Sequence, residues 1–434
     1  RRLTVTGPRL SDPSWSPDGA HLACYTEDAR SAPRHVQVAV TDASGGEPQP
    51  VTTALDRNCR PFTGYREPVW DSEGSLLFVV DDGGNTHLHR VHLGDEPKTE
   101  VVVEGERTVT GFDTASGVLA YVATTPTTLP EVFVVDGERE RKLTRFTESN
   151  LSGLTLGVPQ RFTATSRDGA SVDAWMIPPV GCENGRTYPA LLNVHGGPFT
   201  QYGNRFFDEF QFQAAGGYAV IYSNPRGSSG GTEAWARAIR APTAKEGPGS
   251  GWGGVDYDDV MSVADAAAEQ FAFVDGQRMG VLGGSYGGYM ASWIVGHTDR
   301  FRAACSERAV NDMALLELSS DFAGAFRYDL GVSVIDDPEE YVRQSPITYV
   351  YDMHTPLLIL HSENDQRCPI DQAETLFVAL RLLGRHAEFW RFPGESHELS
   401  RSGAPRHRVR RQEIILDFFA RHLRDGDGAE GQSR

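Results

Sequence analysis

From about Arg161 onward, short apolar runs alternate with longer stretches of helical periodicity, and no other feature constrains the fold as strongly. A strand, a helix and a further strand in this order build a mostly parallel sheet that helices cover on both faces. In such sheets, chemistry gathers at the carboxyl ends of the strands. The runs that predict buried strands are 190–197, 218–227, 278–285, 355–365 and 387–394, and the stretches that predict helices are 255–271, 287–297, 371–384 and 406–423.

The first ~155 residues follow a different pattern, in which apolar and polar residues alternate between turn signals, as is typical of strands. Three stretches share an aromatic residue, a polar turn with glycine and a strand, and they begin at Trp15, Trp70 and Phe112. Their spacing of roughly 40 to 55 residues fits the four-stranded blades of a β-propeller. A β-sandwich with coincidental turns is the alternative. We therefore predict a partial propeller of about three blades over residues 1–155.

The composition limits the partners of the chain. A net charge of −18 argues against nucleic acid and anionic membranes as main partners. No apolar run approaches the ~18 residues that a membrane span needs. The five cysteines are scattered and have no C-x-x-C spacing, so we expect reduced thiols, no zinc site and no other metal. We expect a cytoplasmic protein, although a signal peptide on a missing N-terminal segment would change that.

The stretch "GGSYGGYM", residues 283–290, places Ser285 directly between a predicted strand and a predicted helix. It contains G-x-S-x-G, the nucleophile elbow, in which a tight strand-to-helix turn presents the serine hydroxyl above the sheet. The glycines are needed because side chains there would collide with the neighbouring strand and helix. A structural turn is the alternative, and the strand–turn–helix context favours the nucleophile.

A serine nucleophile needs a base and an acid that orients the base, in the chain order serine, acid, histidine for this fold. Asp365 ends one predicted strand and His397 follows the last one, so both belong to the edge that carries Ser285. Asp371 begins a helix and is expected to cap it. Other candidates fit less well by position, namely His361, His386, His407, His422, Glu363 and Glu395.

Acyl transfer also needs backbone donors for the oxyanion that forms on the carbonyl. The N–H of Tyr286, directly after the nucleophile, is one expected donor. The stretch "HGGP", residues 195–198, follows an early strand, and we expect Gly197 to supply the second donor. His195 beside it is expected to be structural.

With these residues assembled, the chain resembles the prolyl oligopeptidase family of serine peptidases, in particular its acylaminoacyl-peptidase-like branch. The resemblance implies an α/β-hydrolase catalytic domain over residues 156–424, preceded by an all-β propeller. It implies a catalytic triad of Ser285, Asp365 and His397, and it implies that Arg367 anchors the substrate backbone. The stretches that carry it are "NVHGGPFTQYG", "SNPRGSSGG", "GGVDYDDVM", "GGSYGGYMASWIVG", "TPLLILHSENDQRCPIDQAE" and "RFPGESHELSRSGAPRHR".

The expected activity is cofactor-free hydrolysis of an amide bond in a short peptide or aminoacyl compound, of the acylaminoacyl-peptidase, aminopeptidase or dipeptidyl-peptidase type. A carboxypeptidase of the same family, an esterase with the same residues and a propeller scaffold with an inactive hydrolase domain are the alternatives. Three blades are fewer than the roughly four to eight that close a propeller. We therefore expect a further N-terminal segment. The exposed edges of an open ring would favour association, as a homo-oligomer or with that segment.

The arginines that open the last helix, from about residue 406, are expected to form a solvated face. The terminal stretch 425–434 has the composition of a disordered tail.

Overall fold

The computed structural model describes residues 9–64, 66–137 and 139–424, and these form two compact units. The contiguous domains that the sequence predicts stay predictions, and the first unit also includes two segments that follow residue 198. The predicted tail, 425–434, lies outside the described residues. The first unit, called the β unit below, consists of Arg1–Thr155, Phe199–Phe207 and Arg226–Ala238, and the second, the α/β unit, of Leu156–Pro198, Asp208–Pro225 and Ile239–Arg434.

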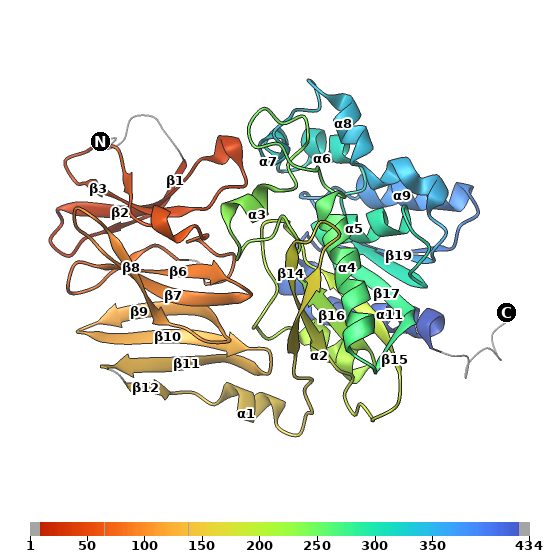
Figure 1. The fold of residues 1–434 in the computed structure, drawn as a ribbon, viewed down its shortest axis with the longest axis horizontal. Helices are drawn as coiled ribbons and strands as arrows, with labels where there is room; N and C mark the ends of the chain where they lie inside the picture. The colour runs from red at the N-terminus through yellow and green to blue at the C-terminus, as the bar shows by residue number, and fades with distance from the viewer. Residues whose placement is uncertain (1–8, 65, 138, 425–434) are drawn as a thin grey trace. The chain divides into compact units, whose positions relative to one another are not determined.

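The strands of the β unit form antiparallel meanders in chain order (Figure 1). One sheet holds the first four strands, and a second sheet holds the next eight. A single parallel pairing, Thr86 with Thr108, joins the two halves of the second sheet. The strands are β1 (Arg9–Trp15), β2 (His21–Glu27), β3 (Gln37–Asp42), β4 (Gln49–Pro50), β5 (Val69–Trp70), β6 (Leu76–Asp82), β7 (Asn85–His92), β8 (Lys98–Val103), β9 (Thr108–Ala115), β10 (Val118–Thr125), β11 (Thr128–Asp136) and β12 (Arg139–Lys142).

Strand β6 is buried on both faces, and it shows how this unit forms its core. Successive side chains of a strand point to opposite faces. Leu76, Phe78 and Val80 accordingly pack with residues of β2 and β3, while Leu77 and Val79 pack with residues of β9 and β10. The β unit therefore has two apolar layers, one on each side of β6. Its short helical elements are η1 (Ala29–Ser31), η2 (Thr53–Leu55), α1 (Phe146–Leu151) and α3 (Glu233–Arg237).

A buried carboxylate, Asp81, ties the two late segments into the β unit. Asp81 Oδ1 accepts hydrogen bonds from Gln201 Nε2 at 3.0 Å and Thr86 Oγ1 at 3.1 Å. Asp81 Oδ2 accepts one from Ser229 Oγ at 2.8 Å. Burial raises the pKa of Asp81 to about 6, and these donors oppose the rise. A contiguous reading of the sequence cannot place Gln201 and Ser229 beside β6, because only the folded chain brings them there.

The α/β unit is an eight-stranded sheet in the order β13-β14-β16-β15-β17-β18-β19-β20. Strands β13 and β14 pair antiparallel to their neighbours, and the others are parallel. The five predicted strands correspond to β15, β16, β17, β19 and β20, and the structure adds β18 between two of them. The bounds are β13 (Gln160–Thr165), β14 (Ser171–Ile177), β15 (Tyr188–Val194), β16 (Ala219–Ser223), β17 (Val274–Gly284), β18 (Ala303–Glu307), β19 (Leu357–Ser362) and β20 (Ala387–Phe392).

Helices cover both faces of this sheet, as the alternating pattern predicts (Figure 1). The last helix packs Phe418 and Phe419 against Leu191, Leu282 and Leu358 of three strands, so its apolar face anchors the middle of the sheet. The helices are α2 (Asp208–Ala215), α4 (Val255–Gln270), α5 (Tyr286–Val295), α6 (Met313–Ser319), α7 (Phe326–Leu330), α8 (Pro338–Arg343), η3 (Pro346–Asp352), α9 (Asp371–Leu382), α10 (Leu399–Ser402) and α11 (Pro405–Leu423).

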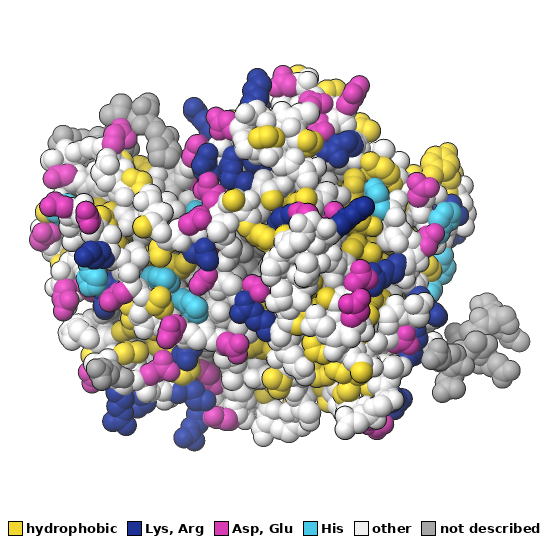
Figure 2. Space-filling model, viewed as in Figure 1, with side chains coloured by type: hydrophobic (Ala, Val, Ile, Leu, Met, Phe, Trp, Pro, Cys, Tyr) yellow, Lys and Arg dark blue, Asp and Glu magenta, His cyan; other side chains and the backbone are white. Residues whose placement is uncertain are grey.

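Acidic and basic side chains are interspersed on the face that Figure 2 shows. Many of them form ion pairs with both partners partly exposed, such as Arg421 with Glu388 and Arg391 with Glu374. Exposed pairs of this kind contribute about 0–1 kcal/mol each. Each of these exposed pairs therefore contributes little to the stability of the fold. No helix in the described ranges is long and apolar enough to cross a membrane.

Candidate active site

Ser285 lies in a strained turn between β17 and α5. Its φ of 61° and ψ of −119° fall outside the regions that residues with a side chain usually adopt. The neighbouring glycines leave room for this turn, since a Cβ on Gly283 would lie 2.5 Å from the carbonyl oxygen of Val194. The Ser285 N–H donates to the Glu307 carbonyl of β18 at 3.0 Å, which fixes the turn against the sheet. The predicted strand–turn–helix context of Ser285 is therefore present.

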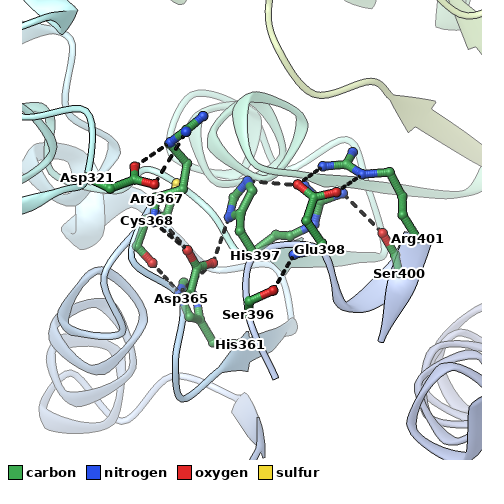
Figure 3. Close-up of polar contacts among 11 residues, drawn as sticks. Asp321, His361, Asp365, Arg367, Cys368, Ser396, His397, Glu398, Ser400 and Arg401 are labelled. Atoms are coloured by element: carbon green, nitrogen blue, oxygen red, sulfur yellow. Dashed lines mark hydrogen bonds and ion pairs between the residues drawn. The ribbon is translucent and has the colours of Figure 1, made fainter. Parts of the chain in front are cut away.

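Asp365 and His397 form a buried hydrogen-bonded pair at the same edge of the sheet. Asp365 follows β19, His397 follows β20, and His397 Nδ1 lies 2.7 Å from Asp365 Oδ2 (Figure 3). The other carboxylate oxygen accepts the N–H groups of Arg367 at 3.0 Å and Cys368 at 2.8 Å. A carboxylate held in this way accepts a hydrogen bond from Nδ1–H, so that the Nε2 lone pair is the one that can act as a base.

The environment of His397 favours its neutral form. Burial lowers the pKa of His397, the hydrogen bond to Asp365 raises it, and the charge of Arg308 lowers it again. The net direction is downward from the ordinary value. A neutral imidazole is the form that can accept a proton.

Ser285 and His397 are not hydrogen-bonded to each other among the described residues. His397 Nε2 instead faces Arg308 Nη1 at 3.3 Å. The Ser285 hydroxyl lies beside the thiol of Cys368. Burial raises the pKa of this thiol, and a hydrogen bond with the Ser285 hydroxyl lowers it by a smaller amount. The structure thus brings the acid and the base together and places the serine at the same edge.

The two expected oxyanion donors flank this turn. Tyr286 is the first residue of α5, and the first N–H groups of a helix have no partner within the helix. Its side chain is buried and donates to Asp256 Oδ2 at 2.6 Å. The glycine loop lies against Ser285, because a Cβ on Gly196 would be 3.4 Å from that of Ser285. Gly197 follows in the same loop, next to the residue that contacts Ser285, and its role as the second donor stays a prediction.

Arg367 is tied to a carboxylate in this structure (Figure 3). Its Nε lies 2.6 Å from Asp321 Oδ1, and its guanidinium stacks 5.5 Å from the ring of Phe322. The side chain is half exposed, at 49%. Arg367 is therefore adjacent to Asp365 and accessible to solvent, in an orientation that an ion pair fixes.

The competing residues are held by contacts of their own, and His361 Nε2 also lies 3.6 Å from Asp365 Oδ2. His361 Nε2 contacts the Cys368 carbonyl at 2.7 Å, and Glu395 contacts His407 at 2.6 Å. His195 is buried and contacts the Gly196 carbonyl, and burial lowers its pKa to about 4. The expectation that Asp371 caps α9 is wrong, because Ile370 is the N-cap and no side chain caps this end.

Sequence reasoning missed three charged residues near the site. Glu307 ends β18 and Arg308 follows it, and β18 itself was not predicted because its residues, "AACSE", are small and lack the β-branched character of a strand. The expectation that the arginines of α11 form a solvated face is wrong for Arg411. This residue is 5% exposed, and its guanidinium pairs with Glu307 at 2.5 Å and Glu209 at 3.1 Å.

One group of potential metal ligands lies elsewhere in the α/β unit. Ligand atoms of His386, Glu388 and His422 lie within 4.8 Å of one another. Glu388 is already held by Arg421 through contacts of 2.7 and 3.0 Å. Because His386 precedes β20 and His397 follows it, this group lies at the opposite end of the strand from the candidate site.

Comparison with known proteins identifies the family. The model of the prolyl oligopeptidase family matches residues 204–426. The chain belongs to this family. Members of the family are serine hydrolases, so the resemblance seen in the sequence is confirmed at that level.

Relatives of this prolyl oligopeptidase family chain include peptidases from several organisms. It is 36% identical over 363 residues to the "Uncharacterized peptidase YuxL" of Bacillus subtilis, covering 82% of this chain and 54% of that protein. It is 25% identical over 400 residues to dipeptidyl-peptidase 5 of Porphyromonas gingivalis, covering 89% of this chain and 55% of that protein. The chain thus spans about half the length of the curated relatives that it matches.

Solved structures confirm the predicted fold class. An acylaminoacyl peptidase of Pyrococcus horikoshii superposes with a TM-score of 0.82 at 28% identity, covering 96% of this chain and 64% of that one. A puromycin-hydrolyzing peptidase of Mycobacterium tuberculosis shares the fold with a TM-score of 0.78, at 23% identity and with coverage of 98% and 71%. This prolyl oligopeptidase family chain therefore has an α/β-hydrolase domain preceded by an all-β propeller region.

Proposed function

We propose that this chain is a serine peptidase that hydrolyses an amide bond of short peptides or aminoacyl compounds through an acyl-enzyme. Membership of the prolyl oligopeptidase family supports the reaction class. The observation that carries the proposal is the 2.7 Å contact between buried Asp365 and His397, at the sheet edge where the strained turn presents Ser285.

In the proposed first half-reaction, Ser285 Oγ attacks the carbonyl carbon of the substrate while His397 Nε2 takes the hydroxyl proton. Asp365 accepts the hydrogen bond from His397 Nδ1–H throughout the reaction and stabilises the imidazolium. The N–H groups of Gly197 and Tyr286 donate to the oxygen that becomes negative. The C–N bond then breaks as the imidazolium gives its proton to the leaving nitrogen, and the acyl group stays on Ser285.

In the second half-reaction, a water molecule attacks the acyl carbon and gives a proton to His397. The bond to Ser285 Oγ breaks, and His397 returns the proton to the serine. The residues named supply a nucleophile, a base and oxyanion donors, and this set is sufficient for acyl transfer. Ser285 Oγ and His397 Nε2 must come within hydrogen-bond distance before the proton can be transferred.

The inhibitor bound to one relative and the names of others suggest which peptides to test. One solved acylaminoacyl peptidase is bound to Z-Gly-Gly-Phe-chloromethyl ketone, whose N-terminus is blocked. Other relatives are dipeptidyl peptidases. We propose that this chain, too, acts on short peptides, with Arg367 as an anchor for the peptide backbone beside Asp365.

A fluorophosphonate probe on the purified 434-residue chain tests the nucleophile. We expect one labelled residue, located at Ser285 by peptide mapping. A label elsewhere, or none, would contradict the assignment. Matched amide and ester substrates with free, acetylated and carboxylate-bearing ends then test the reaction. A chain that turns over the esters and none of the amides would be an esterase, and the peptidase proposal would fail.

A further inference from the structure

Arg308 is a buried cation with no carboxylate partner among the described residues. Its exposure is 8%, and its Nε is buried without a hydrogen-bond partner. Buried charges are normally paired with an opposite charge, because burial of an isolated charge is costly. Arg308 departs from this rule at the position next to the proposed base, which calls for a functional explanation.

The backbone around Arg308 is held in place from two sides. Its φ of 39° lies in the left-handed region, which is unfavourable for a residue with a side chain. The Arg308 N–H donates to the Leu360 carbonyl of β19 at 2.8 Å. The preceding carbonyl, that of Glu307, accepts the Ser285 N–H at 3.0 Å. The strain is therefore maintained by the same strands that position the nucleophile turn.

The nucleophile turn also leaves room for the guanidinium. A Cβ on Gly284 would lie 2.8 Å from Arg308 Nη2 and 2.9 Å from its Cζ. Gly284 occupies a position of G-x-S-x-G at which the motif itself does not require glycine. A Cβ at this position would therefore displace the guanidinium from its place beside His397.

The guanidinium reaches the base through one nitrogen and a hydroxyl through another. Nη1 faces His397 Nε2 at 3.3 Å, and Nη2 donates to Ser400 Oγ at 3.3 Å. An arginine can only donate, so Nε2 accepts in this contact and carries no proton. The contact is thus compatible with neutral imidazole and incompatible with imidazolium.

We propose that Arg308 is a positioning residue for His397, which holds its Nε2 edge in the resting enzyme, opposes its protonation and cedes Nε2 to Ser285 when substrate binds. This inference rests on the proposed peptidase function. The Ser285 hydroxyl and Arg308 compete for one lone pair, which accounts for the absence of a hydrogen bond between Ser285 and His397 among the described residues. Two positive charges at this distance repel each other, so the base resists protonation by solvent.

Other charged groups near His397 must be considered for any effect of pH. Asp365 follows β19 and favours the protonated form, and Arg401 of α10 disfavours it. Arg401 is bound to Glu398 and is 38% exposed, so solvent screens its charge. The groups that interact electrostatically with His397 are Asp365, His361, Glu307, Arg308, Glu398 and Arg401.

The test is the pH dependence of the rate at which a fluorophosphonate inactivates the chain, compared among wild type, Arg308→Met and Arg308→Lys. Inactivation requires neutral His397, so the rate falls on the acid side of its pKa. We expect Arg308→Met to shift this acid limb to a higher pH by about one unit. At pH values below the limb, the inactivation rate should therefore be roughly tenfold lower than that of wild type. Arg308→Lys keeps the charge and should keep most of the wild-type limb.

Arg401→Gln is the matched control, because it removes an equal charge from an exposed position. We expect its acid limb to stay within a few tenths of a unit of wild type. An unmoved acid limb in Arg308→Met, or a shift in Arg308→Lys equal to that in Arg308→Met, would overturn the inference. In either case, labelling of the wild-type chain at Ser285 would leave the proposed function standing. If Arg308→Met does not fold, wild type alone decides: an acid limb at or above the ordinary histidine value of about 6.5 contradicts the inference.

Discussion

One buried arginine pairs with the last residue of β18, and a second buried arginine directly follows that residue. The two arginines differ in their partners. Arg411 of α11 lies between two carboxylates, with contacts of 2.5 Å to Glu307 and 3.1 Å to Glu209. Arg308, the next residue after Glu307, lies against His397 and Ser400. Glu307 is the last residue of β18 and Arg308 directly follows it, so one residue step separates the two environments.

The difference separates stability from reactivity. A buried arginine whose charge is balanced is part of the structure, and its removal leaves an unpaired carboxylate. A buried arginine without a carboxylate exerts its charge on whatever group lies nearest, which here is the proposed base. Substitutions at the serine turn and at the two arginines test this division between the side of β18 that faces the serine turn and the side that faces α11.

The largest effect is expected for Ser285→Ala on the reactive side. Loss of the nucleophile should lower kcat by about 10⁴-fold or more, because no other member of the triad can replace it. The urea midpoint should stay at the wild-type value or rise, since the substitution removes one hydroxyl and leaves no buried charge without a partner. Peptide turnover and urea unfolding measure the two quantities. Ser262→Ala in α4 is the control, and residual activity within tenfold of wild type would rule out Ser285 as the nucleophile.

Asp365→Asn should follow closely, with kcat lower by about 10⁴-fold. An amide at this position can donate to Nδ1, which favours the tautomer with the proton on Nε2 and leaves no base for the serine. Steady-state kinetics on a peptide amide measure the loss. Asp371→Asn, at the start of α9, should leave kcat within a few-fold. The acid would be misassigned if that control were the more damaging change.

Arg411→Met tests the structural side, and its expected cost is about 3–5 kcal/mol in unfolding free energy. The substitution leaves Glu307 buried without its counter-ion. Arg308→Met makes the same chemical change one residue from Glu307, and we expect it to cost much less, because no carboxylate loses a partner. Urea unfolding of both variants at pH 7 measures the difference. Equal losses in the two variants would break the comparison between the arginines.

The same pair predicts a dependence on pH. Burial alone would raise the pKa of Glu307, but the charge of Arg411 and its hydrogen bonds hold it below the ordinary value. A carboxylate with a depressed folded-state pKa contributes stability above its unfolded pKa of about 4.3, and this is lost as pH falls through the folded value. The gap in stability between wild type and Arg411→Met should therefore shrink on acidification. A gap that stays constant from pH 7 down to the acid transition would contradict this.

The sequence predicted the reactive side better than the structural side. Ser285, Asp365 and His397 follow strongly apolar strands, so their positions at one edge could be inferred from the alternation of strands and helices. Arg308 could not be found, because β18 has small residues and no β-branched pattern. Arg411 appears among exposed arginines of an amphipathic helix, and only the folded sheet shows that Glu307 meets it. In the β unit, Gln201 and Ser229 lie beside Asp81 through contacts between residues far apart in the sequence.

Arg367 provides the smallest expected effect and an intermediate case between the two arginines. Its side chain is half exposed and paired with Asp321, yet its backbone N–H donates to Asp365, the proposed catalytic acid. If it anchors the substrate backbone, Arg367→Ala should raise KM and lower kcat/KM by about tenfold, the value of one charge-assisted hydrogen bond. Labelling of Ser285 by a small probe should be kept, since that reaction does not need the anchor.

Asp321→Asn is the informative partner variant. It frees the guanidinium without removing it, so it should reduce kcat/KM by less than Arg367→Ala. An exposed ion pair alone is worth about 0–1 kcal/mol and predicts little kinetic change in either variant. Unchanged kcat/KM on peptides in Arg367→Ala would assign this arginine to the surface and leave Arg308 as the arginine that acts on the site.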